Sequence, residues 1–538
     1  MNENSTAAAE PELAEPELAE PYLRQILDMA GLAVEYVRAE ANTLYMRGDD
    51  GTEIPVVDFA GGYGSVLLGH NHPEINAYAR DLLAEQTPIH AQFSRHPYAN
   101  RLAAELNRII ARELSDDEPY YAIFGNSGAE SVEAAVKHAE LDRGMRISAL
   151  LDTVGAELDA ARTAVSTGAA TVHGETAARL GVALAADDND AFRLLETEIK
   201  RRNSETAAAP PLFLALEGGF HGKLAGSVQL THNESYRLPF KSLAAQARFV
   251  PQDRPEALRA VRAQERRVLL GLSTERGRIT VTEHEFPVFC AFLVEPIQGE
   301  GGIRVLSPEF AREIQEFCAA IDCPVVVDEI QSGMGRTGTL LASSRIGLRG
   351  DYYTLAKTLG GGIAKASVML VREKRYRRDF EVVHSSTFAK DSFSCHIALR
   401  VLDLLERDGG AAYRQAEERG VALRAKLDAV RAEFPDVVLD VRGRGLMQGL
   451  EFRDQSDASS PELREIAGSG LFGYFLAGHL LRRHRVRTFP TASAVGTLRF
   501  EPSIQVTDAE LDQLYDGLRD VCTLLRKQAG DELTAAGR

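Results

Sequence analysis

Between Tyr22 and residue 385, short apolar runs alternate with helical segments, and this pattern constrains the fold more than any other feature of the chain. Five runs are rich in β-branched or aromatic residues, at 120–124, 211–217, 288–295, 324–329 and 366–371. Strands that alternate with helices build a mostly parallel sheet covered by helices. We therefore predict an α/β domain here. Beyond residue 390, longer helical patterns with two short strand-like segments predict a smaller α+β domain.

Two segments stand apart from this pattern. Residues 9–21 read AEPELAEPELAEP, an acidic proline-containing repeat that cannot build a core, so we predict a leader without fixed structure at 1–21. Residues 141–209 are rich in alanine and charge and show helical periodicity. We predict a helical insertion that packs on the large domain or at its edge, outside any catalytic centre.

Charge and cysteine content exclude several classes of function. The chain has 61 Lys and Arg against 78 Asp and Glu, a formal charge of −17, which argues against nucleic acid and against an anionic membrane surface as partners. The five cysteines show no zinc-ligand spacing, so we expect no metal and reduced thiols. No apolar run is long enough to span a membrane and no signal peptide begins the chain, so a cytoplasmic location is expected.

The strongest chemical signal comes from two polar residues that follow apolar runs. Asp328 ends the run PVVVDE, where a carboxylate faces the ligand edge of a parallel sheet. Lys357 follows DYYTLA and precedes three glycines, which let a backbone approach a bound group closely. A lysine that loses hydration in such a place can be neutral and nucleophilic, and an aspartate nearby can pair with a pyridinium nitrogen.

Two common nucleotide-binding motifs fit this sequence less well. Gly333, Gly335 and Gly338 spell G-x-G-x-x-G after a strand, but the following TLLASSRIGLRGD is a poor helix, whereas a dinucleotide-binding turn must open one. The chain contains no G-x-x-x-x-G-K-[ST] phosphate loop. The segment YYAIFGNSGAESVEAAVKHA is a better candidate for an anion-binding site, because the amides near Gly128 and Ala129 begin a helix there. In GGFHGK, Phe220 beside His221 suits contact with a flat heteroaromatic ring.

At this point the chain resembles the class III aminotransferases, the family of ornithine, acetylornithine, 4-aminobutyrate and glutamate-1-semialdehyde enzymes. Nine motifs occur in order between about residues 56 and 504, so the resemblance covers most of the chain. They are DFAGGYGSVLLGHNHPEI, GNSGAESVEAAVKHA, GGFHGK, EPIQGEGGI, VVVDEIQSGMGRTG, TLAKTLGGG, SSTF, VRGRGLMQGLEF and LRFEPSI.

The resemblance implies the fold type I of pyridoxal-phosphate enzymes, with a large cofactor-binding domain at 73–385. The smaller domain would combine an N-terminal part at 22–72 with a C-terminal part at 386–538. It also implies pyridoxal 5′-phosphate as cofactor, held by Lys357 as a Schiff base, and a homodimer with shared active sites. The substrates would be a small amino donor and an oxo acceptor.

The resemblance further implies a role for each matching residue. Lys357 would also move the proton during catalysis, Asp328 would keep the pyridine nitrogen protonated, and Gln331 would touch the phenolic oxygen. Contacts to the ring face and phosphate are implied for Phe220, His221, Gly128 and Ala129, and phosphate contacts from the partner subunit for Ser386 and Thr387. Arg499 would bind the substrate carboxylate, Glu300 would pair with it, and Tyr63 would lie near the substrate.

The sequence departs from the pattern of the family in three places. Asp391 and Ser392 stand where the family has Asn and Pro, Ala129 replaces a hydroxyl residue, and the insertion lengthens the segment before His221. The shared motifs also leave two alternatives open: a family relative that acts as a racemase, decarboxylase or lyase with the same lysine, and a non-catalytic protein that has kept the fold. Intact Lys357 and Asp328 speak against the second alternative.

Overall fold

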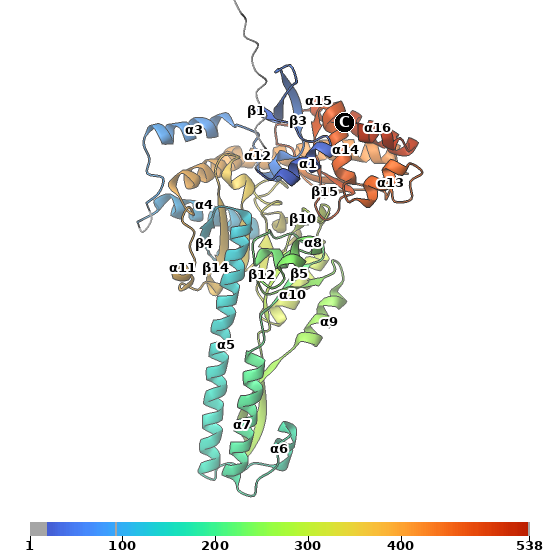
Figure 1. The fold of residues 1–538 in the computed structure, drawn as a ribbon. Coiled ribbons are helices and arrows are strands. Elements are labelled where there is room, and N and C mark those ends of the chain that lie inside the picture. Colours follow the sequence, from blue (N-terminus) through green and yellow to red (C-terminus); the bar gives the residue numbers. More distant parts are fainter. Residues whose placement is uncertain (1–18, 92–93, 536–538) are drawn as a thin grey trace, which may run out of the picture.

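The computed structural model describes residues 19–91 and 94–535, and its centre is a seven-stranded sheet in the order β4-β14-β13-β12-β9-β5-β6 (Figure 1). Only β14 (Ser367–Arg372) runs antiparallel to its neighbours. This confirms the predicted α/β fold with a mostly parallel sheet. The other strands are β4 (Tyr120–Gly125), β5 (Leu212–Leu216), β6 (Ala247–Val250), β9 (Phe289–Val294), β12 (Val325–Asp328) and β13 (Tyr352–Leu355).

The strands in the middle of this sheet are hydrophobic on both faces. Every residue of β9, β12 and β13 is buried, which is the pattern of parallel strands covered by helices on both sides. The helix α5 (Gly128–Ser166) contacts β4, β9, β13 and β14 with its first turns. Further helices of this body are α3 (Pro73–Ala84), α4 (Pro97–Leu114), α9 (Pro255–Glu265), α10 (Pro308–Ala320) and α12 (Ser392–Glu433).

Segments from both ends of the chain combine beside this body. The antiparallel strands β1 (Tyr36–Glu40), β2 (Thr43–Arg47) and β3 (Glu53–Asp58) gain a fourth neighbour, β17 (Val486–Arg487), which pairs parallel to β3. Residues 1–18 of the expected leader lie outside the described residues. The helix α1 (Pro21–Met29) begins at the last residue of that leader.

The C-terminal part contains a second four-stranded sheet flanked by helices. Its strand order is β15-β16-β19-β18, with bounds Val438–Arg444, Met447–Phe452, Thr497–Phe500 and Phe489–Pro490. Its helices are α13 (Pro461–Gly468), α14 (Phe472–His484), α15 (Asp508–Lys527) and α16 (Gly530–Ala535). The shorter elements elsewhere are α2 (Gly61–Gly64), α8 (Glu234–Arg237), α11 (Phe380–Val383), β10 (Ile297–Gln298) and β11 (Arg304–Val305).

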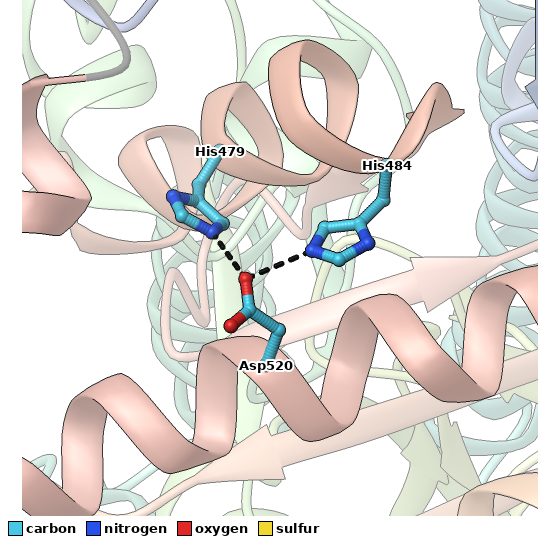
Figure 2. Close-up of side chains that lie close together, drawn as sticks. All are labelled: His479, His484 and Asp520. Atoms are coloured by element: carbon cyan, nitrogen blue, oxygen red, sulfur yellow. Dashed lines mark hydrogen bonds and ion pairs between the residues drawn. The ribbon is translucent and has the colours of Figure 1, made fainter.

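A polar cluster joins α14 to α15 (Figure 2). The Nε2 atoms of His479 and His484 each lie 2.8 Å from the same carboxylate oxygen of Asp520. His479 is buried, whereas His484 and Asp520 are partly exposed. Burial raises the pKa of Asp520, but the hydrogen bonds from the two imidazoles outweigh it and hold the pKa below its ordinary value.

The segment predicted as a helical insertion is helical, and most of it extends outward from the edge of the large domain. The far part of α5, α6 (Gly174–Leu180) and α7 (Asp188–Ala207) form an arm that projects from the body (Figure 1). A hairpin of β7 (Val268–Glu275) and β8 (Arg278–Glu285), about sixty residues further along the chain, completes the arm. These helices need no contact with the central sheet, because the hairpin covers their apolar faces.

The arm has its own apolar interior. Leu158 of α5, Leu195 and Ile199 of α7, and Leu272 and Ile279 of the hairpin are all at most 4% exposed. The hairpin strands pack against all three helices. Among the described residues, none of the helices, here or in the body, combines the length and the hydropathy needed to cross a membrane.

Candidate active site

A cavity of about 500 Å³ opens at the C-terminal ends of the parallel strands. This is the edge at which α/β sheets bind ligands, because the loops that follow the strands converge there. Seven of the residues predicted from the sequence line the cavity together: Gly128, Ala129, Phe220, His221, Asp328, Gln331 and Lys357.

Asp328 and Lys357 come together because they follow neighbouring strands. In the parallel pair β12 and β13, Asp328 lies opposite Thr354, and Lys357 begins the turn directly after β13. The Thr354 hydroxyl and the Ile330 amide donate to Asp328 Oδ1 over 3.1 and 3.2 Å. These bonds fix the carboxylate in one orientation at the floor of the cavity.

His221 is the second partner of this carboxylate. Its Nδ1 lies 2.8 Å from Asp328 Oδ2, and the residue is 2% exposed. Burial lowers the pKa of His221, but the hydrogen bond and the charge of Asp328 outweigh it, so the pKa lies above its ordinary value. His221 and Asp328 therefore form a buried hydrogen-bonded pair that holds the carboxylate in place from its second oxygen.

Lys357 has the environment of a reactive amine. Burial lowers the pKa of the Lys357 amine, and the charges of Glu501 and Glu300 oppose this. Its backbone is left-handed, with φ of 50°, an uncommon conformation for a non-glycine residue and one that clusters at functional sites. The side-chain hydroxyl of Thr358 holds the adjacent turn by donating to the Gly64 carbonyl over 2.9 Å.

The first turn of α5 provides an anion cradle. Ser127 and Glu130 form a reciprocal capping box, which satisfies the amides of Ser127 and Glu130. Among the residues that the structure describes, the amides of Gly128 and Ala129 have no acceptor, and they form the positive end of the helix. A Cβ atom on Gly128 would lie only 2.9 Å from the Ile330 side chain, so a larger residue there would force Ile330 to shift.

Phe220 also lines the cavity, and Glu295 holds its backbone. The Phe220 amide donates to Glu295 Oε1 over 2.8 Å, and the Gly299 amide donates to Oε2 over 3.1 Å. Burial raises the pKa of Glu295 to about 7, with the negative charge of Asp328 adding to the effect. A carboxyl group with such a pKa titrates near neutrality, and Glu295 itself lines the cavity.

A second cluster lies beside the cavity without lining it. Arg499 is 1% exposed, and its guanidinium makes two bonds to Glu300, one of them 2.7 Å from Nη1 to Oε1. Burial raises the pKa of Glu300, but the charge and bonds of Arg499 outweigh it and hold the pKa low. The Tyr63 ring lies 5.1 Å from the guanidinium carbon and stacks on Phe489. The three predicted substrate residues, Tyr63, Glu300 and Arg499, therefore do come together.

Ser386 and Thr387 do not line the cavity. Within the same chain, Asn126 of the cavity wall donates from Nδ2 to Ser386 Oγ over 2.8 Å. The departure at Asp391 has a local explanation, because its carboxylate accepts from the Ser394 amide over 2.8 Å and caps α12. A capped helix thus begins where the family continues with Asn and Pro.

Sequence reasoning missed several residues of the site. Asn126, Lys223 and Glu295 line the cavity, and Glu501 lies directly behind Gln331. The signal was present, because each of them stands inside or beside one of the nine motifs. The partners of Asn126, Glu295 and Glu501, however, are 75 to 260 positions away in the chain, so the motifs alone could not pair them.

Comparison with known proteins identifies the family and supports the fold. The family described as aminotransferase class-III matches residues 29–522 of this chain. Among solved structures, ornithine aminotransferase from Toxoplasma gondii is similar with a TM-score of 0.64 and 20% identity, covering 92% of this chain and 91% of that chain. Ornithine aminotransferase from Plasmodium yoelii gives 0.58 and 20%, covering 91% and 94%. At these identities the structural likeness concerns the fold.

Proposed function

The chain belongs to the class III aminotransferases, and on that premise we propose that Lys357 carries pyridoxal 5′-phosphate in the cavity described above. The family consists of enzymes that depend on this cofactor, and the chain is an aminotransferase. The observation that carries the proposal is the convergence of Lys357, Asp328 and two free amides of α5 on one cavity. The alternative reactions of a racemase, decarboxylase or lyase gain no support from the family match.

The residues present fit the cofactor. Asp328, held in position by the hydrogen bond to His221, would hold the ring nitrogen in its protonated form. The amides of Gly128 and Ala129 would bind the phosphate, Phe220 would cover the ring face, and Gln331 would reach the phenolic oxygen. When bound, the cofactor supplies an electron sink that stabilises negative charge on the substrate carbon.

Lys357 would then act twice. Its Nζ would hold the cofactor until a substrate amine replaced it, and the freed amine would then accept the proton from the substrate carbon and return it. The lowered pKa of Lys357 suits this role, because only the neutral amine accepts a proton.

We assign substrate recognition to the pair of Arg499 and Glu300. The bidentate fork of Arg499 suits a carboxylate, and Glu300 now occupies it. When a substrate carboxylate enters, Glu300 must give way. When the substrate presents an amine without a carboxylate near the reacting carbon, Glu300 stays and neutralises the arginine. One pocket would thus serve an amino acid or ω-amine donor and an oxo-acid or aldehyde acceptor.

Borohydride reduction of the cofactor-loaded enzyme, followed by peptide mapping, tests the assignment of Lys357. We expect the label on Lys357, and a label on another lysine would contradict the proposal. Adding an amino donor without acceptor should convert the cofactor to its amine form and shift its absorbance. An absorbance that survives excess donor would instead indicate racemase or lyase chemistry.

We also propose a homodimer in which Ser386 and Thr387 act across the interface. Mixing Lys357→Ala chains with Thr387→Ala chains would then create heterodimers with one intact site, so activity should return on mixing. If Thr387 serves its own chain, as the same-chain contact of Ser386 with Asn126 allows, mixing restores no activity.

A cytoplasmic location fits the five free, buried cysteines.

A further inference from the structure

Glu501 is a buried carboxylate behind the cavity for which the proposed reaction has no role so far. It follows β19 directly and stands two positions after Arg499, so both side chains leave the strand on the same side. Its backbone amide donates to the Phe59 carbonyl over 2.7 Å, and the residue is fully buried. A carboxylate loses a large hydration energy in such a place and needs compensating partners.

The hydrogen bonds of this carboxylate point toward the cavity. Gln331 donates from Nε2 to Glu501 Oε1 over 2.8 Å, and Gln331 itself lines the cavity. Glu501 Oε2 is buried and has no hydrogen-bond partner among the described residues. A carboxylate that is only half satisfied, and whose single bond goes to a cavity residue, indicates that its charge is used there.

Neutralising Arg336 is the alternative role for Glu501. Arg336 is fully buried, but its guanidinium donates to three backbone carbonyls, those of Gly64, Leu446 and Pro502. Within the described part of the chain, Glu501 forms no ion pair with Arg336 inside 4.0 Å. The charged groups that face Glu501 are therefore Arg336, Arg499 and Lys357, and its one direct bond goes to Gln331.

We propose that Glu501 is a positioning residue that fixes the amide of Gln331 and supplies a negative charge behind Lys357. A carboxylate only accepts hydrogen bonds, so Gln331 must turn its NH₂ group toward Glu501 and cannot flip. The second N–H of that group remains free to reach the cavity. The charge of Glu501 adds to those of Glu300 and Asp328 and opposes that of Arg499 around Lys357.

This inference rests on Lys357 as the residue that carries the cofactor. A lysine–cofactor link absorbs at different wavelengths in its protonated and neutral forms, so its titration reports the local charge. Glu501 acts on the charge of Lys357, so removing this negative charge must favour the neutral form. Glu501→Gln removes the charge while it keeps the size of the side chain and one acceptor oxygen.

The test is a spectrophotometric pH titration of the cofactor-loaded Glu501→Gln enzyme. We expect the midpoint of the titration to fall by about one pH unit or more, because a nearby opposite charge shifts a pKa by that amount. Glu501→Asp, which keeps the charge, should stay within about a third of that shift from the wild type. As a matched control, Glu113→Gln removes a carboxylate that binds the amides of Leu340 and Leu341 away from the cavity, and should move nothing.

The outcomes separate the two roles of Glu501. A lowered melting temperature with an unmoved midpoint would overturn the proposal and assign Glu501 to Arg336. If Glu501→Gln does not fold, Gln331→Leu carries the test: cofactor affinity by equilibrium dialysis should fall about tenfold with an unmoved midpoint, and unaltered affinity would overturn the proposal. Borohydride labelling of Lys357 in the same variants distinguishes this failure from failure of the proposed function, because the label does not depend on Glu501.

Discussion

The cavity and the arm are built by opposite uses of charge. Around the cavity, Asp328, His221 and Glu295 are buried and are held by hydrogen bonds from separate strands and loops. On the arm, charged residues form pairs at the surface, such as Arg162 with Glu196, over an interior of aliphatic side chains. Buried charges lose hydration and remain only where their chemistry is used or fully paired, whereas exposed pairs contribute little energy.

This contrast has a consequence for mutation. A change in the cavity should alter the reaction and leave the stability of the body nearly intact. A change in the arm should alter stability and leave the reaction intact. Each of the following variants tests whether effects on the reaction and effects on stability are separate.

Asp328→Asn should have the largest effect. The amide cannot hold a proton on the ring nitrogen, so kcat should fall by roughly 100-fold or more, about 3 kcal/mol of transition-state stabilisation. Steady-state kinetics and a thermal melt of the same preparation measure both sides of the division. Near-normal kcat would remove Asp328 from the mechanism, and a large loss of stability would show that the carboxylate is structural.

Leu195→Ala tests the arm. Leu195 of α7 is fully buried in the arm interior, so its truncation should destabilise the arm by about 2 to 3 kcal/mol. Hydrogen exchange should detect faster opening of α7 and of the hairpin, while kcat and the cofactor spectrum stay unchanged. Leu214→Ala, at a fully buried position of β5, is the matched change in the body. A loss of cofactor binding in Leu195→Ala would break the division.

Arg499→Lys should change substrate preference by a moderate amount. The lysine keeps the charge but loses the planar fork, so KM for an α-carboxylate substrate such as glutamate should rise about tenfold. KM for an amine without that carboxylate should change much less. If both substrates are affected equally, the bond between Arg499 and Glu300 is structural and our account of substrate recognition fails.

The smallest effect is expected at the cluster of Asp520 with His479 and His484. The folded state holds the pKa of Asp520 below its unfolded value, so the carboxylate stabilises the fold above that unfolded value and loses this contribution as the pH falls through the folded pKa. At pH 7, Asp520→Asn should cost less than about 1 kcal/mol because the site is partly exposed. The difference in melting temperature from wild type should shrink below about pH 4. A difference that grows on acidification would contradict the sign.

The sequence predicted the body well because its chemistry follows its strands. Asp328 and Lys357 are each delivered by the end of an apolar run, and parallel strands bring such ends to one edge. The packing of the arm was harder to predict, because nothing in residues 141–209 indicates which surface will cover their apolar face. The hairpin at 268–285 does so, and its alternating pattern around Arg276 and Gly277 was a readable signal, but its pairing with α5 and α7 was not.

Glu501 and Glu295 were missed for a related reason. Each stands inside one of the nine motifs, yet its importance depends on a partner far along the chain, which is Gln331 for Glu501 and the Phe220 amide for Glu295. Burial of an acidic residue cannot be inferred from its neighbours in sequence when the run around it is short. The predicted substrate-site residue Arg499 could be identified, because its motif names it without reference to a partner.

The helix α5 connects the arm directly to the active-site cavity. It runs without interruption from the anion cradle at Gly128 to Ser166 at the arm's tip, a length of about 58 Å for its 39 residues. No loop separates the two ends, so the tip of the arm and the anion cradle belong to one rigid element.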